Sequence, residues 1–271
     1  MERNSRRSSV ATWRMALLSW MILGLGAASS EQVFTVEKDF KDFNRLQFSH
    51  AFHFQVRQGE EYRTVIRVSE QARKRLLAVQ KGTTVSIGLT PGARIRLGKP
   101  VLRAEVVLPD LVSLELSGAC QGTMTGFTSD AERTIQMDGA SGLGGDVKGA
   151  DLYFGISDAS VLAMGCTTRR VQIRLSGASQ CALKGIGGDL TVEASGASRA
   201  DLARLKANDV KVVLRGASQA GVRVNGRLDI HASGASFLRY KGEAVLGHVE
   251  ISGASRVSGS GAQPREAAGP H

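Results

Sequence analysis

Ser195-Gly196-Ala197-Ser198 is one of eight related tetrapeptides that recur through the second half of the chain. Their first residues are 117, 138, 157, 176, 195, 215, 233 and 252, so successive copies are 18 to 21 residues apart. A period near 20 residues is typical of a solenoid, in which each repeat is one coil that buries its apolar side against its neighbours. The repeat therefore predicts the architecture, whereas function must be sought in sites on that scaffold.

Apolar and polar residues alternate before each tetrapeptide. The positions one and three residues before its first residue are apolar in every copy, and the position five before is mostly Val or Leu. This period of two predicts a strand with one buried face. A second short apolar alternation follows each tetrapeptide. We predict an all-β, single-stranded parallel β-helix with about 19 residues per coil, and the bias of strand crossovers favours a right-handed coil.

The tetrapeptide is interpreted as a corner of the coil. Gly, followed by Asn and Asp, tolerates the left-handed backbone of a sharp bend, and only Asp158 replaces Gly at the second position. The first position is expected to face solvent. Ala at the third suggests crowding between stacked turns, and Ser at the fourth suggests hydroxyls bonded to backbone. These hydroxyls would stack into a column from coil to coil, and a ligand-binding role for this column is the alternative to a purely structural turn. The predicted structural corner residues are Gly118, Gly139, Gly177, Gly196, Gly216, Gly234 and Gly253.

The ends of the chain differ from the repeats. Four Arg residues precede an apolar run from Met15 to Gly26 and small residues follow it, which predicts a Sec-type signal peptide over residues 1–30. The protein is then periplasmic or secreted, and it is not transmembrane after cleavage. No Cys lies near the cleavage point for lipid attachment. We expect N-terminal strands and a cap over residues 31–110, continuous with regular coils over 111–257, and a flexible tail over 258–271.

Positive charge is concentrated before the repeats. The formal net charge is +10, and residues 57–103 hold eleven basic residues against three acidic ones. Within this region, Arg73, Lys74, Arg75 and Lys81 form a candidate patch for anionic surface polysaccharide or lipid headgroups. An ordinary solvated face is the alternative reading. We expect no nucleic-acid partner because no nucleic-acid-binding module is present.

No pattern of catalytic or metal-binding residues is found. The three Cys are expected to be buried thiols rather than a disulfide, and their spacing matches no zinc site. His50 and His53 are predicted to point to opposite faces of one strand, and the remaining histidines are dispersed. No Ser has a plausible His and acid partner. We therefore expect no catalytic residue, cofactor or metal. The single helical signal is the stretch from Glu70 to Gln80.

The order of these features resembles the putative auto-transporter adhesin, head GIN domain family of bacterial envelope proteins. The resemblance is carried by a Phe-rich start, the turn from Val56 to Gly59, the segment Leu108-Pro109-Asp110-Leu111 and the serial corners, and it covers about residues 33 to 260. It implies a secreted or periplasmic β-helix without known catalytic residues.

The favoured function is an exported, non-enzymatic module that binds in the cell envelope, as an adhesin does. The alternative is a structural or oligomerising spacer, because the open end of a β-helix exposes unpaired backbone groups to a second copy. A polysaccharide-active enzyme is less favoured, since such sites need clustered carboxylates. Asp146 and Asp189 lie in equivalent turns but two coils apart.

Overall fold

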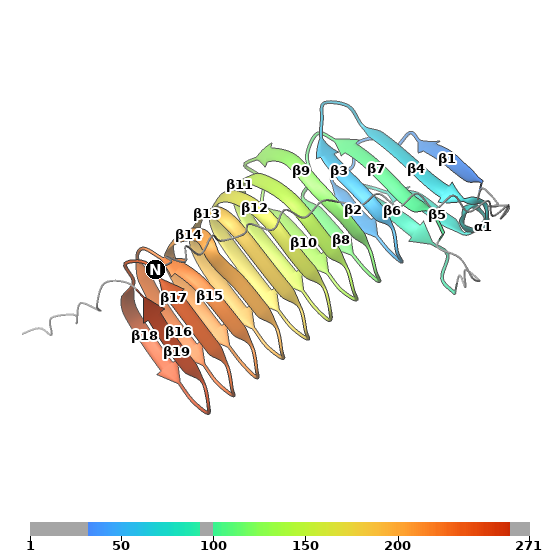
Figure 1. Cartoon of the computed structure of the whole chain (residues 1–271). Coiled ribbons are helices and arrows are strands. Elements are labelled where there is room, and N and C mark those ends of the chain that lie inside the picture. The colour runs from blue at the N-terminus through green and yellow to red at the C-terminus, as the bar shows by residue number, and fades with distance from the viewer. Residues whose placement is uncertain (1–31, 93–99, 261–271) are drawn as a thin grey trace, which may run out of the picture. The chain divides into compact units, whose positions relative to one another are not determined.

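The computed structural model describes residues 32–92 and 100–260 of the 271-residue chain (Figure 1). The N-terminal elements are β1 (Val33–Lys38), β2 (Arg45–Phe48), β3 (His53–Gln58), β4 (Arg63–Ser69), α1 (Glu70–Arg73), β5 (Leu76–Lys81), β6 (Thr84–Leu89) and β7 (Leu102–Leu108). They are followed by β8 (Ser113–Leu116), β9 (Gln121–Ser129), β10 (Arg133–Met137), β11 (Gly142–Ile156), β12 (Val161–Leu175), β13 (Gln180–Ala194), β14 (Arg199–Leu214), β15 (Gln219–Val224), β16 (Arg227–Ala232), β17 (Phe237–Lys241), β18 (Val245–Ile251) and β19 (Arg256–Ser260).

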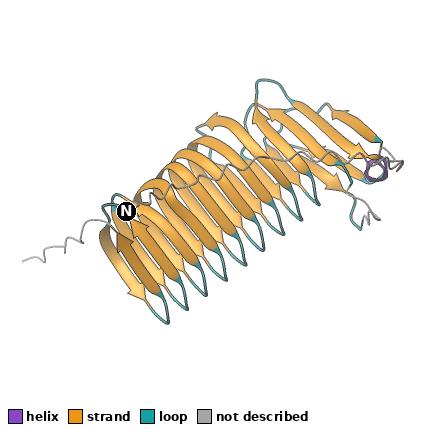
Figure 2. Cartoon of the chain, in the orientation of Figure 1, coloured by secondary structure: helices purple, strands orange, loops and turns teal. Residues whose placement is uncertain are grey.

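Strands of successive coils lie parallel and in register. Leu143 of β11 pairs with Leu162 of β12, which pairs with Cys181 of β13, which pairs with Ala200 of β14. Each partner is one repeat further along the chain, so inward residues stack into apolar columns. The predicted parallel β-solenoid with about 19 residues per coil is therefore confirmed. Figure 2 shows the coils as a stack of strands whose loops line up along one edge.

The coil formed by β2 and β3 lies out of sequence order. These strands pair in parallel with β6 and β7 on one side and with β8 and β9 on the other. Gln47 pairs with Glu115, although 68 residues separate them. The chain thus forms β2 and β3 first, then builds β4 to β7 on one side of them, and then crosses to their other side, where the regular stack begins with β8 and β9.

The bend between β2 and β3 is a further corner that the repeat did not reveal. Ser49-His50-Ala51-Phe52 lies against Ser117-Gly118-Ala119-Cys120, and the Ala119 N–H donates to the carbonyl of His50. His50 takes the position of the corner glycine with φ +73°. The expectation that His50 and His53 share one strand is therefore wrong, because His50 lies in the bend and His53 begins β3.

Strands β1 and β4 to β7, which we call the N-terminal layer, extend the sheet beyond the coil of β2 and β3 and include antiparallel pairs. β4 pairs with β1 on one side and β7 on the other, and β5 pairs with β6 as a hairpin. The predicted helical stretch from Glu70 to Gln80 is correct only as far as Arg73, where α1 ends. Residues 76–81 instead form β5, because backbone pairing with β6 and packing of Leu76 and Ala78 on the core outweigh helix propensity.

The second residue of each tetrapeptide has a left-handed backbone. φ lies between 59° and 81° at these eight positions, and Asp158 is the one that is not glycine. A Cβ at Gly139 would lie 2.3 Å from the carbonyl oxygen of Gly118 in the coil before. Crowding between stacked turns thus falls on the glycine, not on the Ala that we expected to be crowded. The Ala side chain is exposed in all eight copies, and nothing in the structure explains that choice.

The fourth residue of the tetrapeptide points into the core. The Ser179 hydroxyl donates to the carbonyl of Ile156 at 3.1 Å, and the Ser218 hydroxyl donates to that of Ala194 at 3.2 Å. Backbone bonding of the column is therefore seen, although not in every coil. Among the described residues, the hydroxyls of Ser141 and Ser160 are buried without a hydrogen-bond partner.

Arg133 is a buried cation within an apolar column. It stands five residues before a corner, where neighbouring coils place Val or Leu, and its side chain is 1% exposed. Its guanidinium donates to Asp110 Oδ1 at 2.9 Å and to the carbonyl of Leu111 at 2.8 Å, and it lies over the Phe127 ring. Asp110 belongs to the segment that leads the chain from the N-terminal layer into the coils, so this pair fastens the junction.

All three cysteines are free and buried, as predicted. Burial raises the pKa of the Cys120 thiol to about 11 and that of Cys166 to about 12, and it raises the pKa of Cys181 as well. Because the thiolate is the reactive form, we expect a disulfide reagent to leave the native protein unlabelled at about pH 8 and to label three thiols per chain in denaturant. Labelling of the native protein at the rate of a free thiol would contradict this burial.

Two expected segments fall largely outside the described residues. The signal peptide over residues 1–30 lies outside them, as do the last eleven residues of the expected tail, whereas β19 continues to Ser260. Among the described residues, no helix is both long and apolar enough to cross a membrane.

Candidate binding groove

A ladder of outward side chains crosses one face of the coils. It is formed by the residue two places before each corner, and register pairs these residues directly from coil to coil. Alternation forces this arrangement, because the residues on either side of each rung point into the core. We call the row the outer ladder; it consists of Gln47, Glu115, Gln136, Gly155, Arg174 and Glu193.

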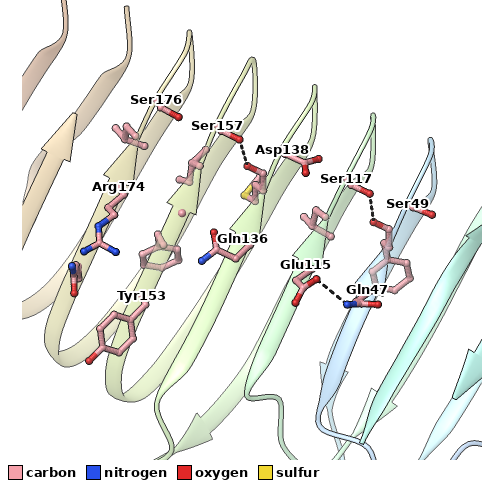
Figure 3. A pocket seen from close by; sticks show the side chains of 18 of the residues that line it. Gln47, Ser49, Glu115, Ser117, Gln136, Asp138, Tyr153, Ser157, Arg174 and Ser176 are labelled. Carbon is pink, nitrogen blue, oxygen red and sulfur yellow. Dashed lines mark hydrogen bonds between the residues drawn. The ribbon is translucent and has the colours of Figure 1, made fainter. Parts of the chain in front are cut away.

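The outer ladder lines a groove of about 930 Å³ (Figure 3). The groove begins at the β5–β6 hairpin, where Leu77 lines it, and reaches Arg215 beyond the end of β14. At the usual spacing of neighbouring strands, the distance from β6 to β13 is about 29 Å. The corner residues Ser117, Asp138 and Ser157 form one side of the groove. The shape is long and open, which suits an extended ligand.

Both ends of the outer ladder are tied by hydrogen bonds. The Ser86 hydroxyl donates to Gln47 Oε1 at 2.7 Å, and Gln47 Nε2 donates to Glu115 Oε2 at 2.9 Å. At the other end, Arg174 Nε donates to Glu193 Oε2 at 3.3 Å. These contacts fix the side chains before any ligand arrives, so less conformational entropy is lost on binding.

The centre of the groove differs from its ends. Within the described part of the chain, no hydrogen-bond partner is seen for the side chains of Gln136, Tyr153 or Gln172. Gly155 adds no side chain between Gln136 and Arg174, and a Cβ there would lie 1.9 Å from Gln136 Oε1. The half-buried Tyr153 stands beside this gap on the same strand. The Gln136 amide therefore lies over Gly155, and an aromatic ring and polar groups without a protein partner line the centre of the groove.

Charge in the groove is mixed. Glu115, Asp138 and Glu193 supply three carboxylates, whereas Arg174 and Arg215 supply two guanidinium groups. The field over the groove therefore gives no strong attraction for a polyanion.

The basic patch predicted from the sequence lies in the N-terminal layer. Arg73, Lys74 and Arg75 are at and after the end of α1, and Lys81 is at the far end of β5; all four are exposed. Five residues, 76–80, separate Arg75 from Lys81 along the extended strand, so the three consecutive residues and Lys81 lie roughly 20 Å apart. Arg73 stacks over the Phe34 ring at 4.5 Å.

Two histidines that appeared dispersed in the sequence come together in the fold. His231 and His248 lie with Glu250 so that one ligand atom from each is within 4.8 Å of the others. The expectation of no clustered histidines is therefore wrong. His231 and Glu250 occupy the same position of consecutive repeats, two before the corner, so alignment of the repeats could have found this pair.

Known structures share the fold. A putative lipid binding protein from Parabacteroides distasonis superposes with a TM-score of 0.78 at 16% identity, covering 85% of this chain and 98% of its own. A putative adhesin from Parabacteroides merdae gives 0.75 at 15% identity, covering 85% and 97%. A putative adhesin from Parabacteroides distasonis gives 0.70 at 15% identity, covering 86% and 96%. At these identities the likeness establishes the fold alone.

Sequence comparison identifies the family. Among curated proteins, none matches the sequence. The family described as putative auto-transporter adhesin, head GIN domain, matches residues 42–244, which is well over half of the chain and includes the out-of-order coil, the N-terminal layer apart from β1, and most of the corners. Together with the register of its coils, this match shows that the chain belongs to the putative auto-transporter adhesin, head GIN domain family.

Proposed function

We propose that this protein is an exported, non-enzymatic binding module of the cell envelope that holds a polysaccharide chain in the groove along the outer ladder. Membership of a family described as putative adhesins supports binding at a surface. The similar solved structures are named as putative adhesins or as a putative lipid binding protein, and none of these names refers to catalysis. The observation that carries the proposal is the groove itself, in which polar side chains repeat at the spacing of the coils.

The chemistry of the groove favours sugar over lipid. Sugars present hydroxyl groups for side-chain amides and carboxylates, and one apolar ring face for an aromatic side chain. Gln136 and Gln172 supply amides, and Tyr153 supplies an aromatic ring beside the gap at Gly155. The apolar residues beneath, such as Phe154 and Ile156, are buried in the core and offer no slot for an acyl chain. Because charge in the groove is mixed, a neutral glycan is the expected ligand.

A groove-filling variant tests this function. Gly155→Gln adds a side chain that meets only the flexible end of Gln136, so we expect a folded protein whose affinity for its glycan is at least about tenfold weaker, which corresponds to about 1.4 kcal/mol. Tyr153→Ala should have a similar effect. Gly221→Gln is the matched control, because Gly221 also lies within a strand, and a Cβ there meets nothing within 4 Å. Binding is measured on a glycan array that includes neutral glucans and heparin.

The same array separates the groove from the basic patch. Binding of heparin or phosphatidylglycerol vesicles that falls with salt, and is lost in a variant with Arg73, Lys74 and Arg75 changed to Glu, would assign the ligand to the patch instead. Retention of neutral glycan by the Gly155→Gln variant would contradict the groove.

A structural spacer is the second candidate. Val249 and Ile251 of β18, which occupy core positions in other coils, are 42% and 47% exposed. An edge of this kind suits end-to-end pairing with a second copy. A protein that binds no glycan, heparin or vesicle, yet gains mass with concentration in light scattering, would favour this function.

A further inference from the structure

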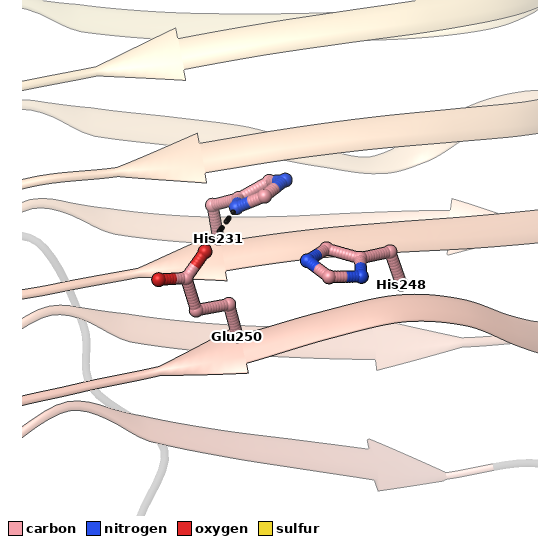
Figure 4. Close-up of side chains that lie close together, drawn as sticks. All are labelled: His231, His248 and Glu250. Carbon is pink, nitrogen blue, oxygen red and sulfur yellow. Dashed lines mark hydrogen bonds and ion pairs between the residues drawn. The ribbon is translucent and has the colours of Figure 1, made fainter.

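A bulge in β18 brings two histidines to one face of the coils. Leu228 of β16 pairs with Leu246 of β18, but Ile230 pairs with Val249, so Gly247 and His248 both lie opposite Asp229. Strand alternation then points His248 and Glu250 to the same outward face. His231 of β16 pairs directly with Glu250 and shares that face. The histidine cluster consists of His231, His248 and Glu250 (Figure 4).

Neighbouring groups hold this bulge in place. The His248 N–H donates to Asp229 Oδ1 at 2.7 Å, and Arg227 Nε donates to the same carboxylate at 2.9 and 3.1 Å. These hydrogen bonds, that from His248 first, hold the pKa of Asp229 below its usual value. A Cβ at Gly247 would lie 2.1 Å from Asp229 Oδ1, so glycine is what allows the carboxylate to reach the His248 backbone. Bulges of this kind re-aim side chains at functional sites.

The three side chains already lie close to one another. His231 Nδ1 is 3.0 Å from Glu250 Oε2, and the two imidazole centroids are 5.0 Å apart. Ligand atoms bound to a tetrahedral ion at metal–nitrogen distances of about 2.0 Å stand about 3.3 Å apart. One ligand atom from each residue lies within 4.8 Å of the others, and His248 and Glu250 are exposed, so small rotations of these two side chains would bring the three atoms to that tetrahedral spacing.

We propose that His231, His248 and Glu250 bind one divalent transition-metal ion, such as Zn²⁺ or Cu²⁺. Two imidazoles and one carboxylate form a donor set that suits these ions and not Ca²⁺ or Mg²⁺, which prefer oxygen ligands. The cluster is on the surface, so at least one coordination position is open to water or to a ligand from outside. His231 and Glu250 stand two residues before their corners, as the residues of the outer ladder do, and the metal site therefore extends that face toward the C-terminal coils.

Titration of the untagged protein with Zn²⁺ or Cu²⁺ tests the site. We expect one ion per chain, and at least about tenfold weaker binding in His231→Ala and in His248→Ala. Glu250→Gln keeps the shape of the side chain and should weaken binding with an unchanged melting temperature. His53→Ala removes another exposed histidine and should have no effect. Electron paramagnetic resonance of the Cu²⁺ form should show coupling to two imidazole nitrogens.

Three results would overturn the site. The first is the absence of binding in the wild-type protein at micromolar metal, and the second is wild-type affinity in both the His231→Ala and the His248→Ala variants. The third is loss of binding on His53→Ala. If a histidine variant has a lowered melting temperature, its affinity is not used. The Cu²⁺ spectra of the wild type and of Glu250→Gln then test the site, because spectra without coupling to imidazole nitrogen would contradict it.

Discussion

Gly196→Val is expected to destabilise the protein by about 2–5 kcal/mol. Gly196 has φ +72°, a backbone conformation that is strained for any side chain and most of all for a β-branched one. A Cβ there would lie 2.6 Å from the carbonyl oxygen of Gly177, which accepts the hydrogen bond from the Ala197 N–H. The added carbon must therefore displace backbone that links two coils, and no rotamer of the valine relieves this contact.

Gly221→Val is the control for that measurement. Gly221 lies within β15, it has no positive φ, and a Cβ there meets nothing within 4 Å. Valine is favoured in strands, so the free energy of unfolding of this variant should lie within about 1 kcal/mol of that of the wild type. Both variants are compared by urea denaturation followed by circular dichroism. Equal midpoints for Gly196→Val and Gly221→Val would refute the account of the corner.

Asp110→Ala should lower the free energy of unfolding by about 3–5 kcal/mol, because it leaves the buried guanidinium of Arg133 without its counter-charge. The carboxylate of Asp110 also accepts a hydrogen bond from the Ser129 hydroxyl at 2.9 Å, so its loss loosens the start of the regular coils at a second point. Arg133→Leu should cost much less, since it removes the charge itself and places an apolar residue where neighbouring coils have one.

The double variant makes this prediction decisive. Asp110→Ala combined with Arg133→Leu should recover most of the stability that Asp110→Ala alone loses, because the cost arises from the unpaired cation. Costs that simply add would show that the two side chains act independently. The readout is again the free energy of unfolding in urea, with circular dichroism spectra to confirm that each variant has the same strand content.

The regular coils could be predicted because local pattern and global fold agree there. Apolar residues at fixed distances from each glycine predicted the buried columns, and the core contains them except in the last coil, where Val249 and Ile251 are exposed. The outer ladder follows from the same register, since a residue two places before a corner must stack on its counterpart. The sequence pattern did not show that Tyr153 and Gly155 line a groove, because a groove depends on the relative sizes of side chains on several coils.

Three features broke the pattern and were missed for different physical reasons. The corner at His50 has no glycine and lies 68 residues from the corner that it contacts, so no fixed period reveals it. Residues 76–81 have helix-forming composition but pair as a strand with β6. Arg133 interrupts a column that is mostly Val or Leu, and the pattern did not show that Asp110 pairs with it and a backbone carbonyl accepts its hydrogen bond there.

The out-of-order coil has a consequence for how the chain folds. β2 and β3 become ordered only when β6, β7, β8 and β9 flank them, so the first coil to be synthesised must wait for later residues to arrive. Pairings over such separations are slow because a long loop must close first. Once β8 and β9 have docked, each following coil adds to a finished template over about 19 residues. Folding should therefore consist of one slow nucleation at the N-terminal end and rapid growth toward the C-terminus.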